Sequence, residues 1–171
     1  RMSPTAPTRT GPRKGVTLTE ALLASVILAA AVLAIIWPFV AANQAQAQAI
    51  QKTHGAALAE ELMEEILAKP FDDPQGSSTP GPEDGESDRS RFDNADDYHK
   101  YTEAAGQMQA LDGSAIRGTW VDGLSRSVTA QYVYLDGQDT TQPPSVLRVI
   151  VRVRRGGDEL AVLTRLIYDC P

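Results

Sequence analysis

Residues 13–42 read RKGVTLTEALLASVILAAAVLAIIWPFVAA and decide the fold of this chain. Two basic residues come first, and a short polar segment then ends in Glu20. The next 22 residues, 21–42, are apolar except for the hydroxyl of Ser25. At about 1.5 Å per residue they form about 33 Å of helix, enough for a bilayer core of about 30 Å. We therefore predict a membrane-spanning helix over residues 16–42.

The charges around this helix predict its orientation and exclude one class of partner. Arg13 and Lys14 directly precede it, so the positive-inside rule puts the N-terminus in the cytoplasm. The chain has 16 Lys and Arg against 22 Asp and Glu, a net charge of −6. Four of the basic residues precede residue 16, and the remaining twelve leave a net charge of −10 downstream. So acidic a chain is not expected to bind nucleic acid.

The helical pattern continues beyond the apolar run, over residues 43–69. This segment is rich in Ala, Gln and Glu and has no proline. Its larger apolar residues fall at multiples of four and form one stripe, which predicts an amphipathic helix: Ile50, Leu58, Leu62 and Ile66. Pro70 ends the helix, and Pro38 within it removes a backbone hydrogen bond and predicts a kink.

We predict that residues 70–115 form an acidic loop and that residues 116–171 form an antiparallel sheet. The part of the loop from Asp72 to Asp88 is dominated by Gly, Pro, Ser and acidic residues and is expected to be partly disordered. Alternating apolar residues predict three strands, Thr119–Val121 is a candidate fourth, and Gly156-Gly157 predicts a hairpin turn. The predicted apolar faces are Val128, Ala130, Tyr132 and Tyr134; Leu147, Val149, Val151 and Val153; and Leu160, Val162, Thr164, Leu166 and Tyr168.

A sheet of three or four strands with one apolar face needs a cover. The stripe from Ile50 to Ile66 is the available one, so the chain is expected to be an α+β protein with the second half of its helix packed on the sheet. The opposite sheet face is expected to carry a solvated row of arginines: Arg148, Arg152, Arg154 and Arg165.

Candidate metal and catalytic residues are few. Asp93, Asn94, Asp96 and Asp97 offer oxygen ligands suited to Ca²⁺, but their spacing is not that of an EF-hand. Solvated loop acids are the preferred interpretation, and no cofactor is expected. The single cysteine, Cys170, cannot form an intramolecular disulfide. No nucleophile–base pairing stands out, so the chain is not expected to be an enzyme.

Glu20 is the residue at the membrane boundary that most needs an explanation. A carboxylate in a spanning helix costs about 2.5–3.5 kcal/mol near the bilayer centre and less near an interface. No basic side chain lies within helical reach after residue 14. A cut between Gly15 and Val16 would create an α-amino cation one helical turn from Glu20, and the amine of a neighbouring subunit could neutralise it equally well. The remaining interpretation is an acid that simply favours the start of a helix.

Residues 13–42 resemble the class III signal peptide of type IV prepilins and type II secretion pseudopilins. The shared pattern is a basic leader, a glycine, an apolar residue, Thr, Leu, a variable position and Glu, followed by about 20 apolar residues. Gly15, Thr17, Leu18 and Glu20 match it. Val16 replaces the usual Phe or Met, and Thr19 stands where Leu or Ile is usual.

The resemblance implies a leader, residues 1–15, that a prepilin peptidase removes after Gly15 before N-methylating Val16. It implies that Glu20 aligns subunits during assembly and that Pro38 corresponds to the family's helix-kinking proline. The implied partners are the peptidase, other pilin or pseudopilin subunits, the inner-membrane assembly platform and the lipid bilayer. The implied location is the bacterial inner membrane, with a periplasmic head, and then a filament. The family's tip subunits often lack the glutamate, so Glu20 implies a position below the tip.

A second similarity concerns the subclass. Residues 60–74, EELMEEILAKPFDDP, and 91–98, RFDNADDY, resemble minor pilins of the MSHA type, which are close to the I-class pseudopilins. This resemblance implies a subunit that primes or caps a filament rather than forming its shaft.

Two other functions compete with filament assembly. An ordinary signal peptide could be cut at Ala45-Gln46-Ala47 or Ala47-Gln48-Ala49 and release a soluble periplasmic domain, although its apolar core is longer than usual. Alternatively, the helix only anchors a periplasmic binding domain for Ca²⁺ or a glycan. The first residue of the mature chain separates these alternatives: Val16, a residue after Ala47 or Ala49, or an uncut Met2. Arg1 precedes Met2, which we interpret as a candidate natural start.

Overall fold

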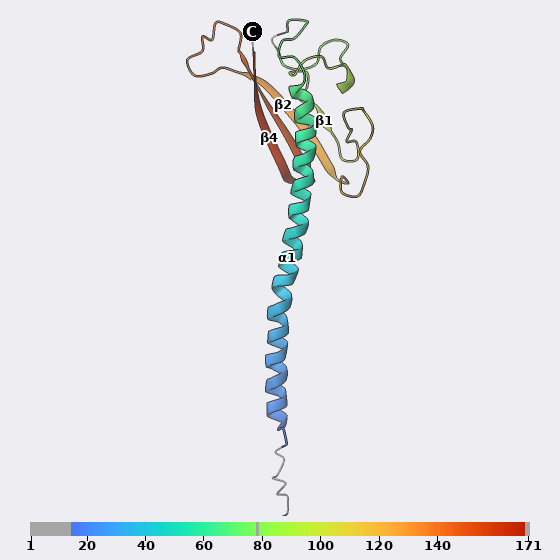
Figure 1. Ribbon diagram of the computed structural model, residues 1–171, viewed down its shortest axis with the longest axis vertical. Helices are drawn as coiled ribbons and strands as arrows, with labels where there is room; N and C mark the ends of the chain where they lie inside the picture. Colours follow the sequence, from blue (N-terminus) through green and yellow to red (C-terminus); the bar gives the residue numbers. More distant parts are fainter. Residues whose placement is uncertain (1–14, 78, 170–171) are drawn as a thin grey trace, which may run out of the picture. The chain divides into compact units, whose positions relative to one another are not determined.

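A computed structural model describes residues 15–77 and 79–169 of the chain. Most of the predicted leader and Cys170 lie outside the described residues. The elements are α1 (Leu18–Leu67), the short 3₁₀ helix η1 (Arg89–Arg91), β1 (Thr102–Glu103), β2 (Leu124–Val133), β3 (Val146–Arg155) and β4 (Asp158–Tyr168) (Figure 1). A long N-terminal helix packs on a four-stranded antiparallel sheet, which confirms the predicted α+β class and is consistent with a pilin-like layout.

The chain divides into two compact units, Arg1–Gln46 and Ala47–Pro171. In the described part of the first unit, the apolar side chains of α1 are exposed. Leu22 is 59% exposed, Ile27 61% and Trp37 73%. Within the described residues, α1 is the one helix long and apolar enough to cross a membrane. It is helical on both sides of Pro38, so the proline does not end it, and a kink there stays a prediction.

The second unit is built around the sheet, whose strands follow one another in the order β1-β2-β3-β4 (Figure 1). Every neighbouring pair is antiparallel, and Val128 of β2 lies opposite Val151 of β3. The predicted hairpin at Gly156-Gly157 joins β3 to β4. Gly156 adopts a φ of 58°, a conformation that glycine reaches without a steric penalty.

The core of the second unit lies between α1 and the sheet. Leu58, Leu62 and Ile66 are at most 3% exposed and belong to the same hydrophobic core as Val128 and Val149. This confirms three of the four residues of the predicted stripe. Ile50 is 49% exposed, so its predicted burial under the sheet is wrong.

Gly55 marks the first buried position on the helix and explains why Ile50 is left out. A Cβ atom at Gly55 would lie 2.9 Å from the Cβ of Leu160, so β4 approaches the helix about as closely as a glycine allows. Contact with the sheet is established here, more than one helical turn beyond Ile50. The sheet therefore covers the stripe only from this turn onward.

The position of the smallest strand also differs from the prediction. Thr119–Val121 is not a strand but lies in successive turns: the N–H of Val121 donates to the carbonyl of Gly118 at 3.1 Å, and the carbonyl of Val121 accepts the N–H of Leu124 at 3.0 Å. The fourth strand is instead β1, which pairs Thr102 with Ser127. Val121 still adds its buried side chain to the core.

The predicted inner face of β4 is also wrong. Leu163 lies opposite the buried Val151, and since cross-strand partners share a face, Leu163 points toward the helix. Ala161 and Ile167 follow the same alternation and pack against the core. Of the side chains predicted to face inward, Val162, Thr164, Leu166 and Tyr168 are exposed and Leu160 is partly buried. Arg165 lies opposite Val149, so it does not share the face of Arg148, Arg152 and Arg154.

Candidate functional site

The first candidate site is the start of α1, where the local sequence caps the helix. The hydroxyl of Thr17 accepts the backbone N–H of Glu20 at 3.3 Å, and the carbonyl of Thr17 accepts that of Ala21 at 3.0 Å. Thr17 is therefore the N-cap, and Glu20 occupies the third helical position, the spacing of a capping box. A carboxylate in this turn is favoured by the partial positive charge of the helix N-terminus.

The residues around the predicted cleavage point are accessible. Gly15 and Val16 precede the helix, and Val16 is 73% exposed. Among the described residues, a Cβ atom placed on Gly15 would have no neighbour within 4 Å. Glu20 is exposed and has no ion pair among the described residues. Gly15, Val16 and Glu20 thus form one local site, while Pro38 lies about 27 Å further along the helix.

The second candidate site is the acidic loop, where the predicted metal ligands lie within one hydrogen-bonded turn. Asp97 accepts the backbone N–H groups of Asp93 and Asn94 on Oδ2, at 2.9 and 3.0 Å. Asn94 Oδ1 accepts the N–H groups of Asp96 and Asp97, at 3.0 and 3.1 Å. These four bonds hold residues 93–97 in a compact turn.

The carboxylates of this turn have different neighbours. Asp96 accepts the hydroxyl of Tyr132 in β2 at 2.6 Å. Asp97 instead lies near Glu83 and Glu86, and one carboxylate oxygen from each of these three residues lies within 4.8 Å of the others. Among the described residues, this is the group with the geometry to hold a metal ion. It contains one of the predicted ligands, Asp97, and not Asp93 or Asp96.

Burial and the nearby negative charges disfavour the ionised forms of Glu83 and Glu86. Glu86 is 7% exposed and Asp97 is fully buried. Burial raises the pKa of Glu83 to about 7, and the nearby charges of Asp73 and Asp97 act in the same direction. Burial also raises the pKa of Glu86, with Asp97 and Asp93 contributing. No salt bridge among the described residues involves any of the three carboxylates.

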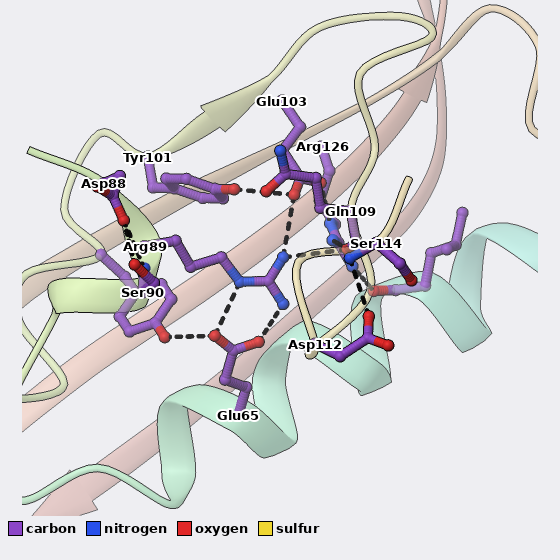
Figure 2. A network of polar contacts seen from close by, with 12 residues as sticks. Glu65, Asp88, Arg89, Ser90, Tyr101, Glu103, Gln109, Asp112, Ser114 and Arg126 are labelled. Carbon is purple, nitrogen blue, oxygen red and sulfur yellow. Dashed lines mark hydrogen bonds and ion pairs between the residues drawn. The ribbon is translucent and has the colours of Figure 1, made fainter. Parts of the chain in front are cut away.

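A buried ion network connects the loop to the rest of the head (Figure 2). Arg89 of η1 forms a two-pronged salt bridge with Glu65 of α1, donating from Nε at 2.8 Å and from Nη2. Its Nη1 donates to Glu103 of β1 at 3.1 Å. Arg126 of β2 donates from Nε to the other oxygen of Glu103 at 2.7 Å. Two acids and two arginines thus alternate, and their charges balance.

The remaining donors and acceptors of the network are also satisfied. Arg126 donates to the carbonyl of Leu58 in α1, and both arginines donate to the carbonyl of Gln109, at 2.9–3.0 Å. The hydroxyl of Tyr98 donates to Glu65 at 2.7 Å, and that of Tyr101 donates to Glu103 at 2.8 Å. A buried charge group is stable only when it is paired and hydrogen-bonded in this way. The network therefore attaches the loop to the helix and the sheet.

Sequence reasoning did not find the network or the two glutamates of the acidic group. Glu65 and Arg89 are 24 residues apart, and Leu58 and Arg126 are 68 residues apart, so no periodic pattern connects them. Glu83 and Glu86 lie in the segment expected to be partly disordered. The structure instead gives this segment definite contacts, such as that of Glu83 N–H with Glu86 Oε2 at 3.1 Å.

Comparisons of the chain with protein-family models, curated proteins and solved structures find no match.

Proposed function

We propose that this chain is a minor-pilin or pseudopilin subunit of a type IV pilus or type II secretion pseudopilus. A membrane prepilin peptidase cuts it after Gly15 and methylates Val16. The subunit then leaves the bilayer and packs its apolar helix against those of other subunits. In this proposal the head carries no catalytic site and provides the surface by which the subunit meets its partners.

One observation carries most of the proposal: a carboxylate stands at the head of a helix whose apolar side chains have no partner in the described chain. Glu20 is in the first turn, and the side chains of the following apolar run are exposed. A lipid bilayer satisfies such side chains, and so does a bundle of identical helices. Glu20 favours the helix bundle, because a charged group within an apolar bundle needs a cation, which a neighbouring α-amino group can supply.

Maturation of the N-terminus tests the proposal directly. Cells that contain an active prepilin peptidase should yield a chain that begins at N-methylated Val16, as measured by mass spectrometry of the membrane fraction. Gly15→Val should leave the leader attached, because a side chain would stand next to the scissile bond. Gly11→Val changes a leader glycine away from the bond and should be cut normally. An intact leader in the unaltered chain would contradict the proposal.

A secreted or anchored periplasmic binding domain is the second candidate. The compact second unit begins at Ala47, where the Ala45-Gln46-Ala47 sequence would be cut by an ordinary signal peptidase. The same mass spectrum separates the candidates. A mature chain starting after Ala47 or Ala49 favours a released domain, and an uncut chain favours a permanent anchor.

A further inference from the structure

We propose that the open edge of β4 is a docking site for an extended segment of another protein, one that carries aliphatic side chains and a carboxylate opposite Arg165. The segment adds a strand to the sheet. This inference gives the head a binding surface and a partner of stated chemistry, and it requires neither cleavage at Gly15 nor assembly into a filament. Its test can therefore fail while the proposed function stands, and the reverse.

The two edges of the sheet differ in how they are covered. At one edge, β1 pairs with β2, and the chain just before β1 extends this contact: Val128 donates to the carbonyl of Tyr101 at 2.9 Å and accepts the N–H of Lys100 at 3.2 Å. At the other edge, β4 pairs with β3 and with no further strand of the described chain (Figure 1). A strand with one free side presents N–H and C=O groups that another strand can bind.

The register between β3 and β4 identifies these free backbone groups. The N–H of Asp169 donates to the carbonyl of Ser145 at 3.0 Å, and hydrogen-bonded and non-hydrogen-bonded pairs alternate along an antiparallel ladder. The residues of β4 whose N–H and C=O groups point to the open edge are therefore Val162, Thr164, Leu166 and Tyr168. The carbonyl of Thr164 accepts a side-chain bond from Nη1 of Arg165 at 3.1 Å, as expected of an acceptor that β3 does not use.

The side chains of β4 are incompletely covered on both faces of the sheet. On the face toward the helix, Val151 of β3 is fully buried, whereas its β4 partner Leu163 is only partly buried. On the opposite face, Val162 is 46% exposed and Leu166 is 42% exposed. An added strand with aliphatic side chains buries apolar surface on both faces, which is the main favourable term in association.

β4 lacks most of the features that protect natural sheet edges from pairing. Such edges are commonly short or carry lysine or proline, but β4 has 11 residues and contains neither. Its irregularity lies near its start, beside Val153 and Arg154 of β3, and leaves residues 161–168 regular. The charge within this regular part is Arg165, opposite Val149 on the helix-facing side. An inward charge excludes strands that cannot neutralise it, so the edge is open but selective.

Arg165 determines the charge of the partner. Its side chain is exposed and forms no salt bridge with the described residues. Because Arg165 directs its backbone groups toward β3, a residue opposite it on an added strand stands in a non-hydrogen-bonded pair, with the two Cα atoms about 4.5 Å apart. An acid at this position forms a cross-strand ion pair, and a lysine is repelled.

The charges of β4 favour a different protein over a second copy of this chain. Pairing of two β4 strands would need an available acid in each to meet Arg165 of the other. Glu159 is the acid nearest to the regular part of β4, and it already contacts Arg152 at 3.8 Å and Arg154 at 3.5 Å. A partner that supplies its own carboxylate meets the requirement without breaking these contacts.

Binding of designed peptides to the full-length chain in detergent micelles tests the proposal. A short fluorescent peptide alternates Val with Thr and has Glu at its centre, and a matched peptide has Lys in place of the Glu. The Glu peptide should bind about three- to tenfold more tightly than the Lys peptide. Equal affinities, or no saturable binding of the Glu peptide up to its solubility limit, would overturn the proposal.

A charge exchange on the chain separates recognition from loss of folding. Arg165→Glu should reverse the preference, so that the Lys peptide binds more tightly than the Glu peptide, a result that an unfolded variant cannot produce. Arg117→Glu makes the same change at an exposed arginine outside the strands and should keep the preference for the Glu peptide. An Arg165→Glu chain that still prefers the Glu peptide would exclude the charge pairing on which the proposal rests.

A pair of substitutions at Thr164 tests the backbone contribution. Thr164→Pro removes an N–H that points to the open edge, a position where a strand tolerates proline, and should weaken binding of the Glu peptide about fivefold or more. Thr164→Val keeps the N–H and should bind the peptide as the unaltered chain does. Equal binding by the two variants would show that the peptide does not extend the sheet.

Amide hydrogen exchange locates the peptide without any substitution. In the free chain, the N–H groups of Val162, Thr164 and Leu166 should exchange rapidly, and those of Leu163 and Arg165 slowly because they are bonded to β3. The Glu peptide should slow the first three. Unchanged exchange at saturation would place the peptide elsewhere. Protection of the same amides that grows with the concentration of the chain alone would make a second copy the occupant, and either result would overturn the proposal.

Discussion

Glu65 shows how a single residue can connect three parts of the head. It belongs to α1, receives two hydrogen bonds from Arg89 of η1, and accepts a third from the hydroxyl of Tyr98. Burial by itself raises the pKa of Glu65, but the bonds from Arg89 and Tyr98 outweigh this effect, and the pKa lies below its ordinary value of 4.5. A residue that is held in its charged form stabilises the fold only while it stays charged.

The lowered pKa of Glu65 predicts a dependence of stability on acidity. The contribution is complete above the unfolded pKa of about 4.5 and is lost as the pH falls through the lower folded value. Glu65→Gln should destabilise the head by about 1.5–3 kcal/mol at pH 7. The difference between the two proteins should shrink below pH of about 4.

Thermal unfolding of the detergent-solubilised chain between acidic and neutral pH measures this difference. Glu64→Gln changes an exposed neighbour and should stay within about 0.5 kcal/mol of the unaltered chain. A difference between Glu65→Gln and the unaltered chain that is the same at every pH would show that the charge of Glu65 is not the cause.

At the scale of elements, the contact between α1 and the sheet determines which apolar residues matter. Leu62 is fully buried and packs in the core, whereas Ile50, on the same predicted stripe, is 49% exposed. Both are large aliphatic residues of one helix, and only their distance from the sheet separates them. They form a matched pair for measuring what the sheet contributes.

Leu62→Ala should lower the stability of the head by about 2–5 kcal/mol, because it leaves a cavity between helix and sheet. Ile50→Ala should change it by less than about 0.5 kcal/mol. Near-ultraviolet circular dichroism of the full chain during heating measures both. Equal effects would mean that the helix packs on something other than this sheet.

Periodicity explains which elements the sequence predicts correctly. The helix, its stripe and three strands have strong periodicity, and their fold class follows from it. The phase of β4 could not be predicted, because both of its faces are apolar: Leu160 and Val162 alternate with Ala161 and Leu163. Only the pairing with Val151 decides between them. β1 has two residues, too few to show any alternation.

The candidate sites were predictable to different degrees for a similar reason. Gly15, Val16 and Glu20 lie within six consecutive residues, so the sequence displays their arrangement directly. The acidic group joins Asp97 to Glu83 and Glu86 across more than ten residues of irregular chain. Such a grouping depends on the turns of the loop, which carry no periodic signal. Asp97 could therefore be named from the sequence, while its companions could not.

At the scale of the whole molecule, the proposed function requires one carboxylate to act within an assembly. Helices rich in Leu and Ala slide past one another easily, and their packing alone gives poor axial register. A buried carboxylate is stable only where it meets a cation, so subunits placed out of register are penalised. N-methylation leaves the charge of the amine of Val16 in place, so the modified subunit can still form the pair.

Glu20→Ala and Glu20→Gln should therefore leave membrane insertion and cleavage largely intact and reduce incorporation into filaments about tenfold or more. Glu60→Ala, an exposed acid further along α1, serves as the control and should be incorporated normally. The amount of subunit that co-purifies with sheared filaments is the measurement. Normal incorporation of Glu20→Gln would show that the residue only starts the helix.

The order in which the ribosome makes this chain has a consequence for how the head forms. Leu58, Leu62 and Ile66 are synthesised first, and the strands that cover them end at Tyr168. At about 5–20 residues per second, translation needs roughly 5–20 s to add the roughly 100 residues in between. Throughout that time the stripe has no sheet to pack on. We expect the head to close only after synthesis is nearly complete, and factors that shield a nascent apolar helix to matter most during this interval.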